Sequence, residues 1–123
     1  MKRYEIWYAR LEPVEGSEIG KTRPCVIVSL DVMNSVLPTL VACPLTSTRH
    51  AGWRSRLKVT CAGKPSELCA DQIRVLSKAR LTKKLGTLTK TEAASLRSLL
   101  TEIRGRLENP LNCNGLIAPT SGD

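Results

Sequence analysis

The stretch GSEIGKTRPCVIVS, residues 16–29, decides the fold, because a polar loop there runs directly into a buried strand. The apolar run of residues 25–28 is typical of a strand covered on both faces. Pro24 has no N–H to donate, which suits the first residue of a strand, and it favours an extended backbone at Arg23. A guanidinium therefore stands where a loop meets a rigid sheet. This position suits an anion-binding group, and an ordinary arginine at a strand edge in solvent is the alternative.

The composition predicts one domain whose core lacks large aromatic side chains. The chain has 123 residues, of which 41% are hydrophobic and 3% aromatic, and it has no Phe. Val, Leu, Ile, Ala and Cys must therefore fill the core. The net charge of +8 and the pI near 9.6 favour a polyanionic partner: nucleic acid, an acidic protein or an anionic membrane. Residues 49–90 hold eleven Lys or Arg against two acids, so the middle of the chain should carry this surface.

The sequence gives no sign of a membrane span, a signal peptide or a metal site. No apolar run approaches the roughly 20 residues that cross a bilayer, and we expect a cytoplasmic protein. The five cysteines include no C-x-x-C pair. Three of them, at positions 25, 43 and 61, lie among apolar strand residues and should be reduced and buried. Because His50 is the single histidine, we expect neither a structural metal nor a Cys–His protease dyad.

Alternating apolar residues separated by turn residues predict a mainly β domain. Pro44 should place the end of its strand at an edge or a bulge. Strands are expected at residues 4–11, 24–29, 39–45, 57–61, 67–76 and 85–88, and polar turns or connections at residues 31–38, 62–66 and 77–81.

One helix is expected near the end of the chain. Residues 89–92, TKTE, fit a capping box, in which Thr89 caps the helix and Glu92 bonds back. Apolar residues then recur at helical spacing from Ala93 to Leu107, with charged residues off this stripe. We expect the helix to pack on the sheet, a free membrane-surface helix being the alternative. The domain then spans residues 1–108, followed by a loose tail at residues 109–123.

The loop of residues 46–56 is rich in hydroxyl groups and then basic, with Trp53 among three arginines. Basic residues beside an aromatic ring can hold a phosphate backbone while a base stacks on the ring. Trp53 has a second interpretation, in which it opens the next strand and packs on the core. The sequence leaves both interpretations open.

Six short segments, in order along residues 4–107, resemble the MazF/PemK (Kid) family of toxin endoribonucleases. The segments are YEIW (4–7), LEP (11–13), GSE (16–18), KTRP (21–24), PLTS (44–47) and DQIR (71–74). The resemblance implies an α+β, mainly β fold: an SH3-like β-barrel, MazF/CcdB-like, with a C-terminal amphipathic helix, forming a homodimer. It implies a toxin of a type II toxin–antitoxin system that cleaves single-stranded RNA at short sequences. The cleavage needs no metal and no cofactor, and it leaves 2′,3′-cyclic phosphate and 5′-hydroxyl ends.

The resemblance also implies partners and roles for individual residues. A cognate acidic antitoxin, MazE-like, would block the RNA groove. The chain would contact DNA only as part of the toxin–antitoxin complex at its own promoter. The family's catalytic arginine falls on Arg23, and its catalytic Thr or Ser falls on Thr46. Candidate substrate-binding residues are Ser17, Glu18, Lys21, Ser47, Arg49, Trp53, Arg54, Asp71, Gln72 and Arg74.

The residue types suit this chemistry. When the 2′-hydroxyl attacks the neighbouring phosphorus, a fixed guanidinium at Arg23 can stabilise the charge on the non-bridging oxygens. Thr46 can donate a hydrogen bond to the same phosphate or orient the attacking oxygen. Asp71 and Gln72 have two interpretations: they contact RNA, or they only hold the hydrogen bonds of the groove.

Two departures from the family pattern place the chain nearer the MazF-like branch. PemK-like members have a histidine where this chain has Ser17, and an arginine two positions before the aspartate, where it has Cys69. The general acid and base therefore stay unassigned. Two rival functions also stay open: a CcdB-like toxin that binds DNA gyrase on the same fold, and an RNA-binding domain that has lost cleavage.

Overall fold

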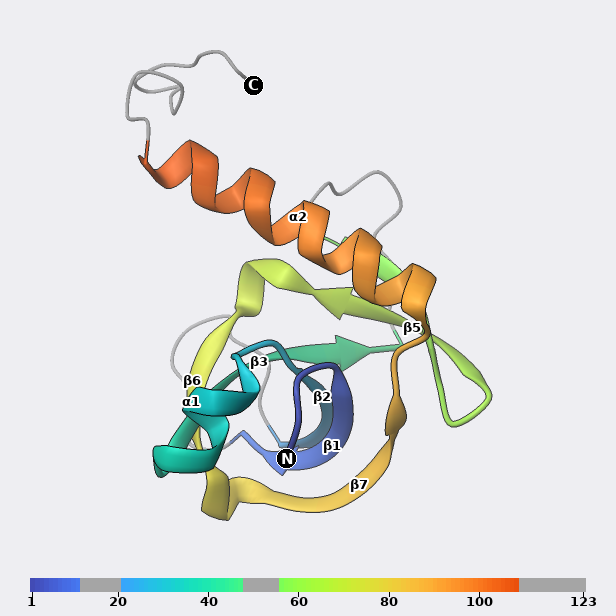
Figure 1. The fold of residues 1–123 in the computed structure, drawn as a ribbon. Coiled ribbons are helices and arrows are strands. Elements are labelled where there is room, and N and C mark those ends of the chain that lie inside the picture. Colours follow the sequence, from blue (N-terminus) through green and yellow to red (C-terminus); the bar gives the residue numbers. More distant parts are fainter. Residues whose placement is uncertain (12–20, 48–55, 109–123) are drawn as a thin grey trace.

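The computed structural model describes residues 1–11, 21–47 and 56–108, with side chains described as far as residue 102 (Figure 1). The expected tail, residues 109–123, lies outside the described residues. In chain order the elements are β1 (Glu5–Arg10), β2 (Thr22–Ile27), α1 (Asp31–Val36), β3 (Thr39–Thr46), β4 (Arg56–Cys61), β5 (Lys64–Cys69), the 3-10 helix η1 (Ala70–Gln72), β6 (Arg74–Ser77), the 3-10 helix η2 (Lys78–Arg80), β7 (Leu81–Thr87) and α2 (Lys90–Glu108).

The strands form one curled sheet around β3. Neighbouring strands follow the order β4-β5-β3-β2-β1-β7, and β6 pairs β3 off this path. One edge of β3 pairs with β2, whereas the other pairs first with β6, over residues 39–42, and then with β5, at Leu45 and Thr46. The sheet curls into a half-barrel with β6 and β7 on its two sides (Figure 1). The mainly β fold with a curled antiparallel sheet and a C-terminal helix confirms the prediction.

Pro44 lies inside β3 at the point where this strand changes partner. It pairs with Cys25 of β2, while the preceding Ala42 pairs with Arg74 and the following Leu45 pairs with Leu68. A proline cannot donate to a ladder hydrogen bond, so it fits a break between two paired segments. The strand expected over residues 39–45 is present and continues for one more residue, to Thr46.

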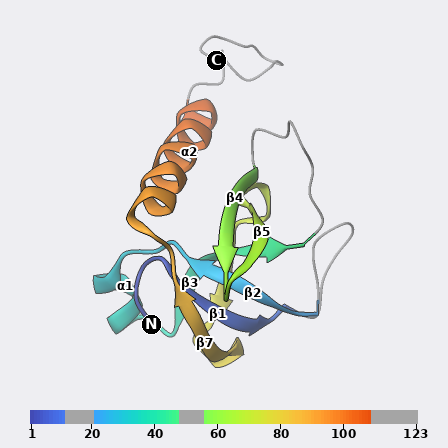
Figure 2. The same cartoon turned by 90° about the vertical axis from the view of Figure 1, so that its right-hand side faces the viewer.

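Successive strand residues face opposite sides of the sheet, and they build two apolar clusters. The first, here called the helix-side core, contains Val26 of β2, Leu45 of β3 and Leu68 of β5, with Leu96 of α2 packed on them. Figure 2 shows α2 standing beside this side of the sheet. The second cluster, the barrel-side core, consists of Ala9, Leu11, Cys25, Ile27, Leu40, Ala42, Leu76 and Leu81.

The start of α2 confirms the predicted capping box. Thr89 Oγ1 accepts a hydrogen bond from Glu92 N at 3.1 Å, and Glu92 Oε1 accepts one from Thr89 N at 3.0 Å. Glu92 Oε2 also accepts from Thr60 N of β4 at 2.8 Å, which ties the helix to the sheet. Ala93 and Leu96 are buried, so α2 packs on the sheet as expected. Among the described residues, no helix is long and apolar enough to cross a membrane.

The expected polar connection over residues 31–38 is wrong for residues 31–36, which form α1. Asn34 anchors this helix because its side chain is buried: Nδ2 donates to Ser29 O at 3.0 Å, and Oδ1 accepts from Ser29 Oγ. Ser29 Oγ accepts in turn from Val41 N at 3.0 Å. The polar residues that indicated a turn therefore fasten a short helix to the sheet.

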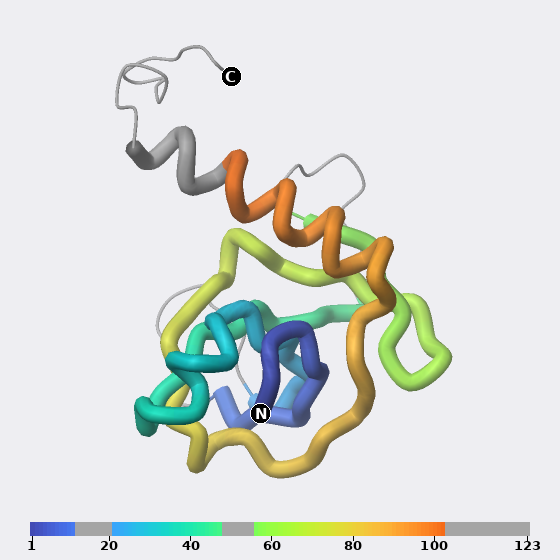
Figure 3. Tube along the Cα trace, viewed as in Figure 1, coloured from blue at the N-terminus to red at the C-terminus, as the bar shows by residue number. Residues whose placement is uncertain are grey.

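The expected strand over residues 67–76 is interrupted. It divides into the end of β5, the 3-10 helix η1 and β6, and β5 begins earlier than expected, at Lys64. The two-residue turn before it, Ala62 and Gly63, has φ angles of 52° and 80°, as a type I′ hairpin requires. The last strand is longer than expected, since β7 spans seven residues. In the chain trace of Figure 3 this gold-coloured segment curves around one side of the fold.

Cys25, Cys43 and Cys61 are buried free thiols, as predicted, and so is Cys69. Burial raises the pKa of Cys25 and of Cys43 to about 12 in each case. These side chains therefore act as small apolar residues of the core.

Candidate active site

Seven of the twelve candidate residues lie in the described part of the chain: Lys21, Arg23, Thr46, Ser47, Asp71, Gln72 and Arg74. The other five, Ser17, Glu18, Arg49, Trp53 and Arg54, lie outside the described residues. The two interpretations of Trp53 therefore both stand.

Arg23 and Thr46 belong to the neighbouring strands β2 and β3. The observed pairing of these strands runs from Ile27–Ala42 to Cys25–Pro44, and two further residues in the same register would place Arg23 opposite Thr46. Arg23 alternates with Cys25 and Ile27, and Thr46 with Ala42, so both positions continue the barrel-side face. Residues directly opposite each other have Cβ atoms about 4.5–5.5 Å apart, so in this continued register one small ligand group would reach both side chains.

A buried carboxylate lies on the other side of Thr46. Glu67 of β5 is the register partner of Thr46, and its side chain is only 4% exposed. It pairs with Arg56, whose Nη1 lies 3.2 Å from Glu67 Oε1. The position of Thr46 between Arg23 and Glu67 makes it the centre of the candidate site.

Arg56 joins three elements of the site. Its Nε donates to Asp71 Oδ1 at 2.8 Å and its Nη2 to Asp71 Oδ2 at 3.4 Å, in addition to the contact with Glu67. Burial alone would lower the pKa of Arg56, but the hydrogen bond to Asp71 and the neighbouring negative charge raise it. Arg56 is therefore a permanent cation that links β4 to β5 and η1.

Sequence reasoning did not single out Arg56 or Glu67 as site residues. In the sheet Arg56 is the register partner of Cys69, the position at which PemK-like members have an arginine. The guanidinium thus reaches Asp71 from the neighbouring strand. The signal in the sequence was the basic residue at the end of the loop, but only the strand register shows what it faces.

Gln72 and Arg74 form a second pair at the start of β6. Arg74 Nη2 donates to Gln72 Oε1 at 3.1 Å, and Arg74 Nε donates to Gln72 O at 3.3 Å. Arg74 pairs with Ala42 of β3 and lies two residues before the buried Leu76 on β6. Both positions therefore belong to the barrel-side face. Asp71 and Gln72 therefore accept hydrogen bonds from Arg56 and Arg74, and both interpretations of these two residues stay open.

Charged groups of both signs lie close to the buried thiols. Burial raises the pKa of Cys69 to about 11, the charges of Arg56 and Arg23 lower it, and those of Asp71 and Glu67 raise it further. Burial also raises the pKa of Cys25, while the charges of Arg74 and Arg23 lower it. The site therefore gathers three guanidinium groups together with two carboxylates.

The chain matches the family model described as "PemK-like, MazF-like toxin of type II toxin-antitoxin system" over residues 2–103. It belongs to the MazF/PemK toxin family. It is 35% identical over 97 residues to the endoribonuclease MazF of Staphylococcus saprophyticus, covering 72% of this chain and 78% of that protein. It is 31% identical over 108 residues to the endoribonuclease MazF of Staphylococcus epidermidis, covering 81% and 88%.

Solved structures of MazF proteins have the same fold as this MazF/PemK-family chain. A crystal structure of MazF from Deinococcus radiodurans aligns with a TM-score of 0.76 and 25% identity, over 85% of this chain and 96% of that chain. A mycobacterial endoribonuclease in complex with its cognate antitoxin aligns with a TM-score of 0.72 and 22% identity, over 85% and 95%.

A cationic hollow lies where β1 ends and β2 begins. It has a volume of about 450 Å³ and is lined by Arg10, Lys21, Thr22, Ser77, Ala79 and Arg80. Two arginine side chains bond to backbone carbonyls across it: Arg10 Nη2 donates to Ala79 O at 3.5 Å, and Arg80 Nη1 donates to Arg10 O at 3.0 Å. The described lining residues include three cations and two hydroxyl groups and no acid, a combination that suits an anion.

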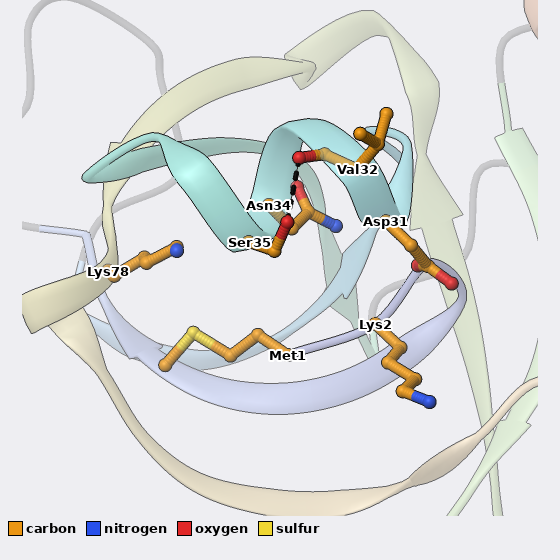
Figure 4. Close-up of a pocket in the computed structure, with 7 residues that line it drawn as sticks. All are labelled: Met1, Lys2, Asp31, Val32, Asn34, Ser35 and Lys78. Carbon is orange, nitrogen blue, oxygen red and sulfur yellow. Dashed lines mark hydrogen bonds between the residues drawn. The ribbon is translucent and has the colours of Figure 1, made fainter.

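A second hollow, of about 680 Å³, lies between the N-terminus, α1 and η2 (Figure 4). Its lining mixes Lys2 and Lys78 with Asp31 and the apolar side chains of Met1 and Val32. It contains none of the candidate residues, so it is separate from the site. Within the described residues, no group of three or more His, Cys, Asp or Glu could hold a metal ion.

Proposed function

We propose that this chain is an endoribonuclease that cleaves single-stranded RNA without a metal ion. The 2′-oxygen would bond to the adjacent phosphorus as the bond to the 5′-oxygen breaks, leaving a 2′,3′-cyclic phosphate and a 5′-hydroxyl. The observation that carries this proposal is the pairing of β2 with β3, in a register whose continuation would place Arg23 opposite Thr46 on one face. Family membership supports it, since the related staphylococcal proteins are named endoribonucleases.

The proposed roles follow from the chemistry of each group. Arg23 holds the non-bridging oxygens and stabilises the charge that develops on them, because its guanidinium stays protonated. Thr46 donates a hydrogen bond to the same phosphate or orients the 2′-hydroxyl. Ser47 and Arg74 would bind substrate from the two sides of Thr46, and the cationic hollow would hold a flanking phosphate through Lys21.

We propose an acidic, MazE-like antitoxin as the protein partner, which would cover the positively charged site. A solved complex of a related endoribonuclease with its antitoxin, and MazE–MazF complexes from Deinococcus radiodurans, support a partner of this kind. Contact with DNA would occur only through the toxin–antitoxin complex, and both proteins would act in the cytoplasm.

We also propose that the toxin is a homodimer and that residues 1–108 form the active unit. Valines on two adjacent elements are unusually exposed: Val32 and Val36 of α1 are 67% and 73% exposed, and Val75 of β6 is 65% exposed. Exposed apolar groups of this kind mark interaction surfaces. Light scattering should give twice the mass of the chain, and Val36→Asp should reduce it to that of one chain. A monomeric unaltered chain would contradict this proposal.

The activity is tested by incubating the purified chain with a long RNA in EDTA. Discrete fragments with 2′,3′-cyclic phosphate ends are expected, and mapping these ends gives the cleavage sequence. A chain that ends at residue 108 should produce the same fragments. Intact RNA with inhibited DNA gyrase would favour a CcdB-like function instead, and intact RNA that is bound would favour a domain without cleavage activity.

A further inference from the structure

Arg56 compensates the charge of two carboxylates near the site. Its side chain is 7% exposed and contacts Glu67 in β5 and Asp71 in η1 through three hydrogen bonds. The side chain of Glu67 is more buried still, at 4% exposed, and a carboxylate that is buried without a cation is strongly disfavoured. Arg56 therefore keeps Glu67 in place beside Thr46.

The position of Glu67 beside Thr46 explains why its negative charge needs a neighbouring cation. Glu67 is the register partner of Thr46, so an uncompensated charge there would stand next to a bound phosphodiester and repel it. Other charged groups also face this region: Lys58 is the register partner of Glu67 in β4, Arg23 approaches from β2 and Arg74 from β6. Arg56 contacts both carboxylates directly, at 3.2 Å from Glu67 Oε1 and 2.8 Å from Asp71 Oδ1.

We propose that Arg56 is a positioning residue of the cleavage site: it neutralises Glu67 and Asp71, so that a phosphodiester of RNA can lie beside Thr46 and Arg23. This inference rests on the proposed function. It differs from a purely structural role for Arg56, in which the arginine only ties β4 to β5 and η1. The two roles predict different results when the carboxylate is removed together with the arginine.

The main test compares single-turnover cleavage by Arg56→Gln and by the double variant Arg56→Gln/Glu67→Gln. The single variant should cleave about 100-fold more slowly at pH 8, because the phosphate is repelled and misplaced. The double variant should cleave at least tenfold faster than Arg56→Gln, because no charge is left at Glu67. Equal loss in both variants would overturn the proposal. Arg97→Gln, which removes an exposed arginine of α2, is the matched control and should cleave like the unaltered chain.

The pH profile, measured as activity per folded molecule so that a change in stability does not enter, supplies a second readout. Without Arg56, the buried carboxyl of Glu67 loses its partner and its pKa rises. The protonated carboxyl no longer repels phosphate, so the ratio of Arg56→Gln activity to that of the unaltered chain should rise as the pH falls from 8 to 5. Arg56→Lys keeps the charge, so its activity ratio should change little over the same range. A flat ratio for Arg56→Gln would contradict the proposal.

A variant that keeps Arg56 covers the case in which Arg56→Gln does not fold. Glu67→Gln should bind a noncleavable 2′-O-methyl oligoribonucleotide about threefold more tightly, since it removes a negative charge beside Thr46. Equal or weaker binding would overturn the proposal. If the unaltered chain binds this oligonucleotide but never cleaves RNA, the proposed function fails while the charge compensation by Arg56 is still measured. If it cleaves RNA and the variants show no rescue, only the role of Arg56 fails.

Discussion

The helix-side core and the barrel-side core share β1, β2 and β3, and on β2 and β3 the barrel-side positions continue into Arg23 and Thr46. On β2 and β3, one set of alternate positions ends in Val26 and Leu45 beneath α2, whereas the other set passes from Cys25 to Arg23 and from Ala42 to Thr46. Alternation allows one strand to serve stability with one face and catalysis with the other. Substitutions on the two faces should therefore separate these properties.

The largest effect is expected on the helix-side core. Leu96 of α2 is fully buried in it. Leu96→Ala should lower the free energy of unfolding by about 2–5 kcal/mol, because it removes buried methyl groups and leaves a cavity. Urea denaturation measures this loss. Cleavage per folded molecule should stay within twofold of the unaltered chain, and a larger decrease would show that the two faces are coupled.

The reverse result is expected for Arg23 on the barrel-side face. Arg23→Ala should reduce single-turnover cleavage by about 10²–10³-fold, as the loss of one electrostatic contact with the reacting phosphate typically does. The midpoint of thermal unfolding should change little, since Arg23 is half-buried at the end of a strand. An Arg23→Ala protein that cleaves RNA at the original rate would remove this residue from the mechanism.

A third substitution tests Glu5, whose carboxylate links the start of β1 to Lys84 of β7. Glu5 accepts hydrogen bonds from Trp7 Nε1 at 3.0 Å and Lys2 N at 2.9 Å, and it lies 3.1 Å from Lys84 Nζ. Burial alone would raise the pKa of Glu5, but these contacts lower it to about 2.

The lowered pKa of Glu5 gives a stability that is fully present above about pH 5 and is lost as the pH falls towards 2. Unfolding by urea at pH 7 and at pH 2.5 should show a decrease of about 1.5–3 kcal/mol from this carboxylate. Glu5→Gln should be less stable at pH 7 and should lose less on acidification. An equal acid dependence in the variant would contradict the assignment.

The smallest effect is expected at the cationic hollow. Lys21→Gln leaves the mutual contacts of Arg10 and Arg80 intact and removes one positive charge. If Lys21 contacts a phosphate of the RNA, binding of a noncleavable oligoribonucleotide should depend less on salt. The slope of the logarithm of the association constant against the logarithm of the salt concentration should become smaller in magnitude by about 0.7. Arg97→Gln on α2 provides the comparison and should leave the slope unchanged. An equal slope in all three proteins would exclude Lys21 from the interface.

The sequence predicts regular elements well and the site only in part, and the residues show why. The capping box at Thr89 and Glu92 is local, so it could be identified without a fold. The helix α1 was missed because Asn34 makes its decisive bonds with a serine of the preceding segment. Arg56 and Glu67 were missed because strand register, which no short motif encodes, brings them together.

The buried cysteines have a consequence for studying this chain in solution. With pKa values of about 12 for Cys25 and Cys43 and about 11 for Cys69, these thiols are almost entirely protonated at neutral pH and shielded from reagents. They should react with an alkylating agent only when the sheet opens. The rate of alkylation of each cysteine, followed by mass spectrometry, would then measure how often its strand opens.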